Sequence, residues 1–296
     1  MGTVLWPTDK ILLAIFIVLA MMSITFEATL HQVATVLRDK SLVARALVIN
    51  FVLVPLLAIT LVQLIPMALD VKDGILLLAV VPGNFLAFNF TRQLCGKINL
   101  AAAVLFLLTF TGVIIAPISA TWIVQSQLPV IMPYGKVLKP IALYVILPLI
   151  AGLALNRFFP KLAAALQKPF TVISALAFIG FTISTGSVKT AAAKAIAGGG
   201  ALFGLTLFIL GAMMLGWFFG GSDRETRGVM SLSSGLRNFA VCLAIATHSF
   251  PDSNVDLTII ACVTLGIPMA LLFTIYQKRK AKKVQRMVAR PTAGAA

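Results

Sequence analysis

The sequence predicts an all-α polytopic membrane protein, built as an inverted-repeat bundle of nine transmembrane helices. Of its 296 residues, 60% are hydrophobic and only 11% are charged, and the mean hydropathy is +1.03. Soluble domains contain about 25% charged residues, so this composition excludes an ordinary soluble domain. Apolar stretches that can cross a hydrocarbon core of about 30 Å recur along nearly the whole chain. Two of these stretches are interrupted near their centres by polar and small residues.

The predicted spans follow one another with short connections. The first runs into Glu27 without an A-x-A-like processing site, so we expect a retained helix and not a cleaved signal peptide. Because the connections are short, residues 1–277 should form a single transmembrane domain, followed by a basic tail over residues 278–296. In chain order, the nine spans cover residues 8–28, 43–66, 74–95, 98–124, 138–156, 169–189, 198–220, 228–248 and 256–277.

Basic residues are divided unequally between the two sides of the predicted bundle. By the positive-inside rule, the richer side is cytoplasmic, which puts the C-terminus inside and the N-terminus outside a bacterial inner (plasma) membrane. Lys189 and Lys194 lie on the opposite side and run against this bias. The basic residues on the cytoplasmic side are Arg38, Lys40, Arg92, Lys97, Arg157, Lys161, Lys168, Arg224, Arg227 and the cluster Lys278–Arg290.

The motifs exclude several functional classes. A net charge of +15 does not indicate nucleic-acid binding, because the basic residues lie at helix ends and in the tail and form no soluble basic face. The sequence has no H-E-x-x-H zinc motif, no phosphate-binding P-loop and no cluster of intramembrane aspartates. We therefore expect no enzyme activity, no cofactor and no protein-held metal. The expected partners are the lipid bilayer and a small molecule, and the oligomeric state is left open.

The two interruptions predict a transport site. One begins at Pro82-Gly83-Asn84 and extends to Asn89, and the other runs from Ser233 to Asn238. In a bilayer the backbone leaves the helix only where it lines a protein cavity, and inverted-repeat transporters place broken helices at the midplane. Amides and hydroxyls there can donate and accept towards a substrate, or form interhelical hydrogen bonds instead. The predicted substrate-binding residues are Asn50, Asn84, Asn89, Ser233, Ser234, Arg237 and Asn238.

Several short motifs, in their order and spacing, make the chain resemble the bile acid:sodium symporter family, within the bile/arsenite/riboflavin transporter superfamily. The resemblance implies a panel of helices beside a core domain, in which two discontinuous helices cross at mid-membrane. It also implies organic anion substrates and, in many members, coupling to sodium. The motifs are Thr25-Phe26-Glu27-Ala28-Thr29-Leu30, Asn50-Phe51-Val52-Leu53-Val54-Pro55, Val81-Pro82-Gly83, Leu147-Pro148-Leu149-Ile150-Ala151-Gly152 and Ser233-Ser234-Gly235-Leu236.

This chain departs from the sodium-coupled members at the positions of their sodium ligands. Sodium needs several hard oxygen ligands to replace its water shell inside a protein. Aligned on the second interruption, the family's glutamate and glutamine fall on Gly228 and Leu232, and a further glutamine falls on Asn50. An amide is kept at Asn89, and two hydroxyls of the following helix have no counterpart among residues 102–107. Too few oxygens remain for the family's sodium sites.

Arg237 lies in the second interruption, where sodium-coupled members usually lack an arginine. An arginine near the bilayer centre costs about 2.5–3.5 kcal/mol, so it needs a role. It could clamp the carboxylate or sulfonate of a substrate with a bidentate fork. It could instead replace the missing sodium charge by donating to backbone carbonyls at the broken helix ends. The third alternative is that it snorkels to an interface or pairs with a structural carboxylate.

These observations predict a secondary active transporter of an organic anion, either bile-acid-like or a small carboxylate, that works by alternating access without the family's usual sodium sites. The alternatives are a sodium-coupled organic anion symporter with altered sites, and a passive channel or scramblase. Short loops and paired broken helices fit alternating access better than a passive pore.

Overall fold

The chain is helical throughout its described secondary structure. In the computed structural model of the protein, the described residues are 7–27, 34, 36–83, 85–95, 98–119, 142–184, 200–250 and 253–288. In chain order the elements are α1 (Pro7–Glu27), α3 (Lys40–Val48), the π-helical turn η1 (Ile49–Leu53), α4 (Val54–Leu64), α5 (Leu69–Val80), α6 (Phe85–Cys95), α7 (Ile98–Ser119), the π-helical turn η3 (Ala142–Ile146), α10 (Leu147–Phe158), α11 (Pro160–Ser184), α13 (Ala201–Phe219), α14 (Arg224–Gly235), α15 (Phe239–Ser249) and α16 (Val255–Val288).

Apolar composition and helix length together identify an integral membrane protein. Five helical stretches of the described chain are long and apolar enough to cross a bilayer. They are Lys40–Leu64, Pro160–Phe181, Ala201–Phe219, Arg224–Thr247 and Val255–Ala281, and shorter apolar helices accompany them. The stretch Arg224–Thr247 is the most enclosed, because its apolar 18-residue window is entirely buried inside the bundle. Such a buried element must satisfy its polar groups within the protein.

Two helices extend well beyond the apolar runs that predicted them. Helix α11 begins at Pro160, so the residues around Lys161 and Lys168, expected to form a loop, are helical, and only Phe159 separates α10 from α11. Proline is favoured at the first helical position, which explains this start. Helix α16 continues to Val288, past the predicted domain boundary at residue 277. Hydropathy marks where a helix meets lipid, and polar residues can continue the helix into water.

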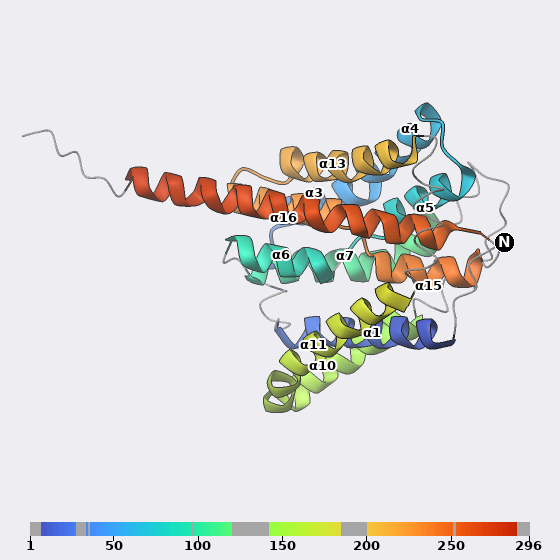
Figure 1. Cartoon of the computed structure of the whole chain (residues 1–296). Helices are drawn as coiled ribbons and strands as arrows, with labels where there is room; N and C mark the ends of the chain where they lie inside the picture. Colours follow the sequence, from blue (N-terminus) through green and yellow to red (C-terminus); the bar gives the residue numbers. More distant parts are fainter. Residues whose placement is uncertain are drawn as a thin grey trace, which may run out of the picture.

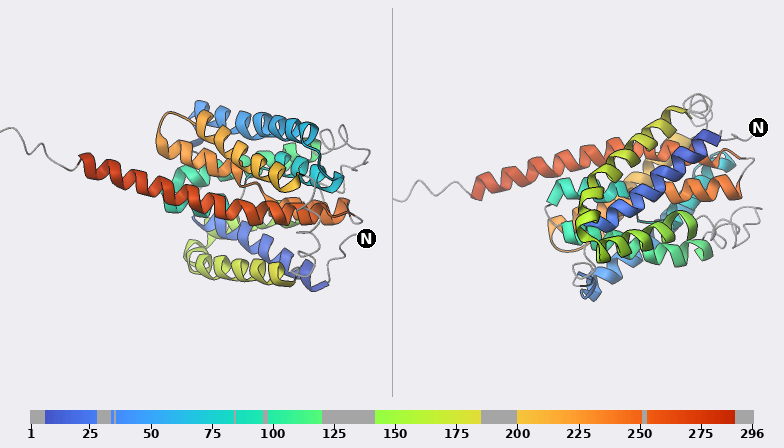
Figure 2. Two further views of the ribbon diagram at one scale, coloured as in Figure 1. Left: turned by 45° about the horizontal axis from the view of Figure 1, so that its top comes forward. Right: turned by 90° about the horizontal axis from the view of Figure 1, so that it is seen from below.

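The helices form two layers. Helices α1, α10 and α11 pack against one another and lie together on one side of the molecule (Figure 1). We call these three helices the panel. The remaining helices form the core, in which α13 packs along α14, and α14 contacts α6, α7 and α16. The left view of Figure 2 shows the same separation, and in the right view the panel lies in front of the core.

Small residues allow the core helices to approach closely. A Cβ at Gly216 of α13 would lie 2.4 Å from the Met230 carbonyl oxygen of α14. A Cβ at Gly235 would overlap the Met213 side chain of α13. Membrane helices depend on van der Waals contact between backbones, so these glycines bring α13 and α14 together.

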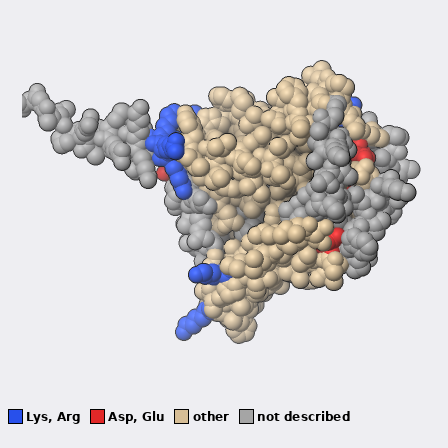
Figure 3. All heavy atoms as spheres, viewed as in Figure 1, with Lys and Arg blue, Asp and Glu red and all other residues tan. Residues whose placement is uncertain are grey.

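Basic residues are distributed unequally between the two ends of the bundle. Lysine and arginine gather at the end where α16 leaves the bundle, and acidic side chains are visible at the opposite end (Figure 3). Asp223 and Glu225, which flank Arg224 at the start of α14, lie at the basic end as well. At the opposite end, Asn254 just before α16 donates from Nδ2 to Asp70 Oδ2 at the start of α5, at 3.0 Å. The excess of lysine and arginine at one end agrees in sense with the positive-inside rule.

Candidate functional site

Two broken helices meet inside the core. Helix α5 ends at Val80 and α6 begins at Phe85, while α14 ends at Gly235 and α15 begins at Phe239. The Asn238 N–H donates to the Val81 carbonyl oxygen at 3.0 Å, which joins one break directly to the other. The sequence therefore predicted correctly that both stretches are discontinuous, and the two breaks lie in contact.

Both breaks are shorter than the polar runs suggested. Asn89 was placed in the first interruption but lies within α6, and Ser233 and Ser234 were placed in the second but lie in the last turn of α14. Serine and asparagine lower helix stability only modestly compared with alanine, so they can continue a helix that is packed inside the bundle. Polarity alone therefore overestimated the length of each break.

Proline and glycine cause the first break. Pro82 has no N–H, so it cannot continue the hydrogen bonding of α5. Gly83 has a φ of +87°, a left-handed conformation that strains any other L-residue. A Cβ at Gly83 would also lie 2.6 Å from Thr109 Oγ1 and 2.9 Å from the Thr109 backbone nitrogen on α7. Glycine is thus required at this position both for its backbone conformation and for the space it leaves to α7.

Asn238 organises the second break. Its Oδ1 accepts from the Val241 N–H at 3.3 Å and caps the N-terminus of α15. Its Nδ2 donates to the Gly83 carbonyl oxygen at 2.7 Å, across to the first break. One buried amide, 2% exposed, therefore both starts a helix and fixes the crossing.

The C-terminal end of α5 offers carbonyl oxygens to residues of the second break. The Leu78 carbonyl oxygen accepts from the Val81 N–H at 3.3 Å, because the residue at position 82 is a proline without an N–H. Arg237 donates from Nε to the Leu78 carbonyl oxygen at 2.9 Å and from Nη2 to the Ala79 carbonyl oxygen at 2.5 Å. The Cys242 thiol approaches the Leu77 carbonyl oxygen at 3.7 Å. Residues 237–242 thus satisfy the C-terminal end of α5.

Asn50 supplies a second set of acceptors from the π-helical turn η1. The Val54 N–H donates to the Ile49 carbonyl oxygen, as a π-helical turn requires, and Pro55 has no N–H. Neither residue therefore serves the Asn50 carbonyl oxygen, which accepts from Arg237 Nη2 at 3.3 Å. The Asn50 side chain donates from Nδ2 to the Ala46 carbonyl oxygen at 3.0 Å, and its Oδ1 accepts from Arg237 Nη1 at 2.7 Å.

The guanidinium of Arg237 is enclosed by neutral oxygens. The side chain is 3% exposed and Asn50 is fully buried. Among its contacts are four hydrogen bonds to oxygens of Leu78, Ala79 and Asn50, on α5 and η1, and the C-terminal end of α5 carries a partial negative charge. A buried cation is tolerated when such acceptors replace its water shell. The contacts have the form expected for a cation that holds broken helix ends together.

The remaining predicted site residues are distributed around this centre. Ser233 and Ser234 are buried, and Ser234 Oγ has no hydrogen-bond partner among the residues that the structure describes. Asn89 is half-buried on α6, and Asn84 lies outside the described residues. The structure brings Asn50, Arg237 and Asn238 together at the crossing. The alternative that Arg237 donates to backbone carbonyl oxygens at a broken helix end agrees with its contacts, but the sequence did not identify which carbonyl oxygens these are. A signal for one of them was present in Pro55, which removes a donor from the Asn50 carbonyl oxygen.

A cavity of about 230 Å³ lies between the panel and the core, beside this crossing. The panel contributes Phe178 and Phe181 from α11, and the core contributes Phe239 and Leu243 from α15 with part of α16. The rings of Phe178 and Phe239 lie 5.2 Å apart, and Phe239 is the first residue of α15. The cavity therefore reaches the N-terminal turn that Asn238 caps.

Comparisons with known proteins agree on one family. A family model described as the sodium bile acid symporter family matches residues 14–198. Among curated relatives, "Probable sodium/metabolite cotransporter BASS5, chloroplastic" of Arabidopsis thaliana is 29% identical over 230 residues, which are 74% of this chain and 56% of that protein. "Uncharacterized sodium-dependent transporter YocS" of Bacillus subtilis is 21% identical over 282 residues, which are 94% of this chain and 86% of that protein. The chain spans about half the length of the plant relatives that it matches.

Proposed function

The chain belongs to the sodium bile acid symporter family, and from that premise we propose that it is a secondary active transporter of an organic anion. The family consists of transporters and not enzymes, which agrees with the sequence analysis. The observation that carries the proposal is the direct crossing of two broken helices, joined by Asn238 and Val81, beside a cavity between panel and core. Alternating access then consists of a movement of the panel against the core around this crossing.

Helix dipoles favour an anionic substrate. Helices α6 and α15 begin at the crossing and direct their positive ends towards it, whereas α5 and α14 end there. The negative end of α5 is already compensated by Arg237. The positive end of α15 borders the cavity at Phe239. The crossing therefore has a surplus of positive potential next to the cavity, as a carboxylate or sulfonate requires.

The cavity walls suit the apolar part of such an anion. Phe178 and Phe239 line the cavity with their rings 5.2 Å apart, and Phe16 of α1 packs behind them at 5.0 and 5.5 Å. Thr264 is the hydroxyl-bearing residue that α16 adds to this otherwise apolar lining. A ring-containing or branched carboxylate would place its hydrocarbon against these aromatic rings and its charge towards α15.

We further propose that transport proceeds without sodium as a co-substrate. A sodium ion at the crossing would need the oxygens of Leu78, Ala79 and Asn50, which already accept from Arg237. The positive charge of the arginine lies at the same oxygens, so their partial negative charge is compensated without a sodium ion. The printed names of the relatives describe sodium-dependent transport, which makes a sodium-coupled symporter the competing candidate.

The orientation belongs to the same proposal. The basic end of the bundle, where α16 leaves it, is cytoplasmic, and the N-terminus of the chain is outside. The membrane is a bacterial inner (plasma) membrane. Surface labelling of single-cysteine variants at either end of the bundle in intact cells would test this orientation.

The substrate can be identified by measuring the melting temperature of the protein in the presence of carboxylates, sulfonates and steroid acids. We expect at least one organic anion to raise the melting temperature and to be taken up by proteoliposomes. Its uncharged methyl ester is the matched compound and is expected to do neither, because the ester lacks the charge that α15 favours. Stabilisation by cationic or uncharged compounds alone would contradict an anion transporter.

Filling the cavity tests whether it is the transport path. In the variant Thr264→Trp, an indole enters a cavity of about 230 Å³ between panel and core. Uptake of the identified anion should fall about tenfold or more, because the cargo loses its space. Leu271→Trp on the same helix is the matched control, since Leu271 is 44% exposed and does not line the cavity. Equal uptake by the two variants would contradict the proposal that the transported anion passes through this cavity.

A further inference from the structure

A second and larger cavity lies outside the panel–core interface. It is a groove of about 570 Å³ between α13 and α16, with Ser231 of α14 at its base. Both flanking helices are apolar enough to cross a membrane, and groove residues Met214 and Leu272 are 56% and 67% exposed. The groove therefore opens towards the hydrocarbon of the bilayer, where water cannot fill it.

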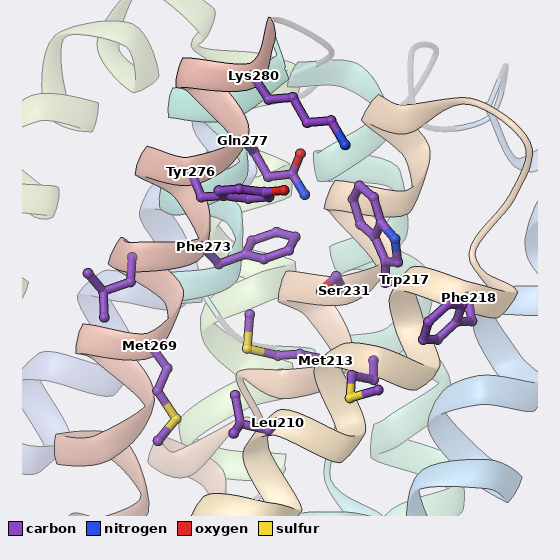
Figure 4. A pocket seen from close by; sticks show the side chains of 12 residues that line it. Leu210, Met213, Trp217, Phe218, Ser231, Met269, Phe273, Tyr276, Gln277 and Lys280 are labelled. Atoms are coloured by element: carbon purple, nitrogen blue, oxygen red, sulfur yellow. The ribbon is translucent and has the colours of Figure 1, made fainter.

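The two ends of this groove differ in chemistry. Figure 4 shows Lys280, Gln277 and Tyr276 at one end, and Leu210 and Met269 at the other. The polar end lies where lysine and arginine gather on the surface (Figure 3). Tyrosine and tryptophan are typical of the membrane–water boundary, which places the polar end at headgroup level. An occupant must therefore be polar at one end and apolar along the rest.

The polar end is held in place by a second cation. Arg224, the first residue of α14, donates from Nε to Gln277 Oε1 and from Nη2 to the Gln277 carbonyl oxygen, both at 2.8 Å. Gln277 is 4% exposed and lines the groove, so its amide is fixed against the wall. Arg224 and Lys280 together give this end a positive charge, which favours an anionic headgroup.

Ser231 indicates a ligand atom part-way along the groove. Its side chain is buried, its Oγ has no hydrogen-bond partner among the described residues, and it lines the groove. Buried hydroxyls normally have a partner, so an unsatisfied one facing an apolar groove calls for an acceptor from outside the chain. Figure 4 shows Ser231 between the Lys280 end and the apolar end. An ester carbonyl below a charged headgroup would lie at such a position.

We propose that the groove between α13 and α16 binds one acyl chain of an anionic phospholipid, with the headgroup phosphate at Lys280 and an ester carbonyl accepting from Ser231. The edge-to-face pair of Trp217 and Phe273, with centroids 5.7 Å apart, forms the wall next to the upper part of that chain. The site is separate from the transport path, since none of its lining residues borders the panel–core cavity. The lipid bridges α13 and α16, and so stabilises the core.

Lipid selectivity distinguishes this site from the general basic surface of α16. The test measures binding of phosphatidylglycerol and phosphatidylcholine with identical acyl chains to the purified full chain by native mass spectrometry. We expect phosphatidylglycerol to bind more tightly, and Lys280→Gln to weaken its binding about fivefold while leaving phosphatidylcholine unchanged. Arg279→Gln is the matched control, because Arg279 is exposed on the same turn but does not line the groove.

Four outcomes would overturn the site. Equal affinity for the two lipids in the unmodified protein would remove the headgroup contact. Equal losses in Lys280→Gln and Arg279→Gln would assign the preference to the basic surface as a whole. If inorganic phosphate at millimolar concentration displaces phosphatidylglycerol, the polar end binds a soluble anion and not a lipid. If the lipid-free protein is a dimer and Leu272→Lys makes it a monomer, a second copy of the chain covers the groove.

The Ser231 contact has its own readout. Ether-linked phosphatidylglycerol lacks the ester carbonyls, so it should bind the unmodified protein more weakly than the ester-linked lipid. In Ser231→Ala the two lipids should bind equally, because the donor is gone. A preference for the ester-linked lipid that persists in Ser231→Ala would overturn the assignment of this hydroxyl to the site.

Discussion

Replacing Arg237 with glutamine is expected to destabilise the protein by about 3–5 kcal/mol and to abolish transport, because each buried acceptor that loses its donor costs about 1–3 kcal/mol. The substitution removes the hydrogen bonds to Leu78, Ala79 and Asn50. Pro55 has no N–H that could replace the lost donor at the Asn50 carbonyl oxygen, whereas the Leu78 carbonyl oxygen keeps the Val81 N–H. Thermal unfolding in detergent measures the first effect, and uptake into proteoliposomes measures the second.

Two further variants sharpen this result. Arg237→Lys keeps the charge but replaces a planar fork with a single ammonium group, so it should recover only part of the stability. Arg227→Gln is the matched control, because Arg227 is a half-buried arginine of the same helix pair that donates to the Gly221 carbonyl oxygen. We expect Arg227→Gln to cost about 1 kcal/mol. An Arg237→Gln protein that unfolds like the wild type but no longer binds the anion would instead make Arg237 a substrate clamp.

Replacing Gly83 with alanine is the second large effect. The residue has a φ of +87°, which costs a non-glycine residue about 1–2 kcal/mol. The new Cβ would also lie 2.9 Å from the Thr109 backbone nitrogen, and overpacking of this kind costs about 1–3 kcal/mol. Because Gly83 also accepts from Asn238, the strain falls on the crossing itself. We expect a destabilisation of about 2–5 kcal/mol and the loss of most uptake.

Gly112→Ala is a matched control for this variant. Gly112 lies on α7 next to the same break, and a Cβ there would lie 3.5 Å from Pro82 Cδ, an ordinary van der Waals contact. Its stability and uptake should stay near those of the wild type. If Gly83→Ala and Gly112→Ala behave alike, the left-handed turn at Gly83 does not hold the crossing.

The sequence was sufficient to predict a helical membrane protein with two broken stretches. Apolar runs located the helices because a membrane span needs length and hydrophobicity, and both can be read along the chain. The ends of α11 and α16 were not predictable in this way, since Lys161, Lys168 and the residues after Gln277 continue a helix without being apolar. Helical propensity decides those ends, and hydropathy does not register it.

The centre of the site was predicted in part. An arginine at membrane depth demanded acceptors, so Arg237 could be singled out from its position alone. Which acceptors it uses depends on two separate segments of the chain. Pro55 has no N–H, which leaves the Asn50 carbonyl oxygen to Arg237, and α5 ends at Val80 before Pro82, where the Leu78 and Ala79 carbonyl oxygens meet the guanidinium. These segments come together only when the helices pack. Ser233 and Ser234 illustrate the opposite error, because their polarity suggested a break where the chain remains helical.

The central claim is that Arg237 occupies the place of a cation, so that the crossing functions without sodium. The direct measurement is the initial rate of uptake of the identified anion into proteoliposomes of the wild-type protein, with sodium replaced by potassium at constant ionic strength. We expect equal rates in the two salts, because the oxygens of Leu78, Ala79 and Asn50 already hold the guanidinium. A steep rise of the rate with sodium would contradict this account.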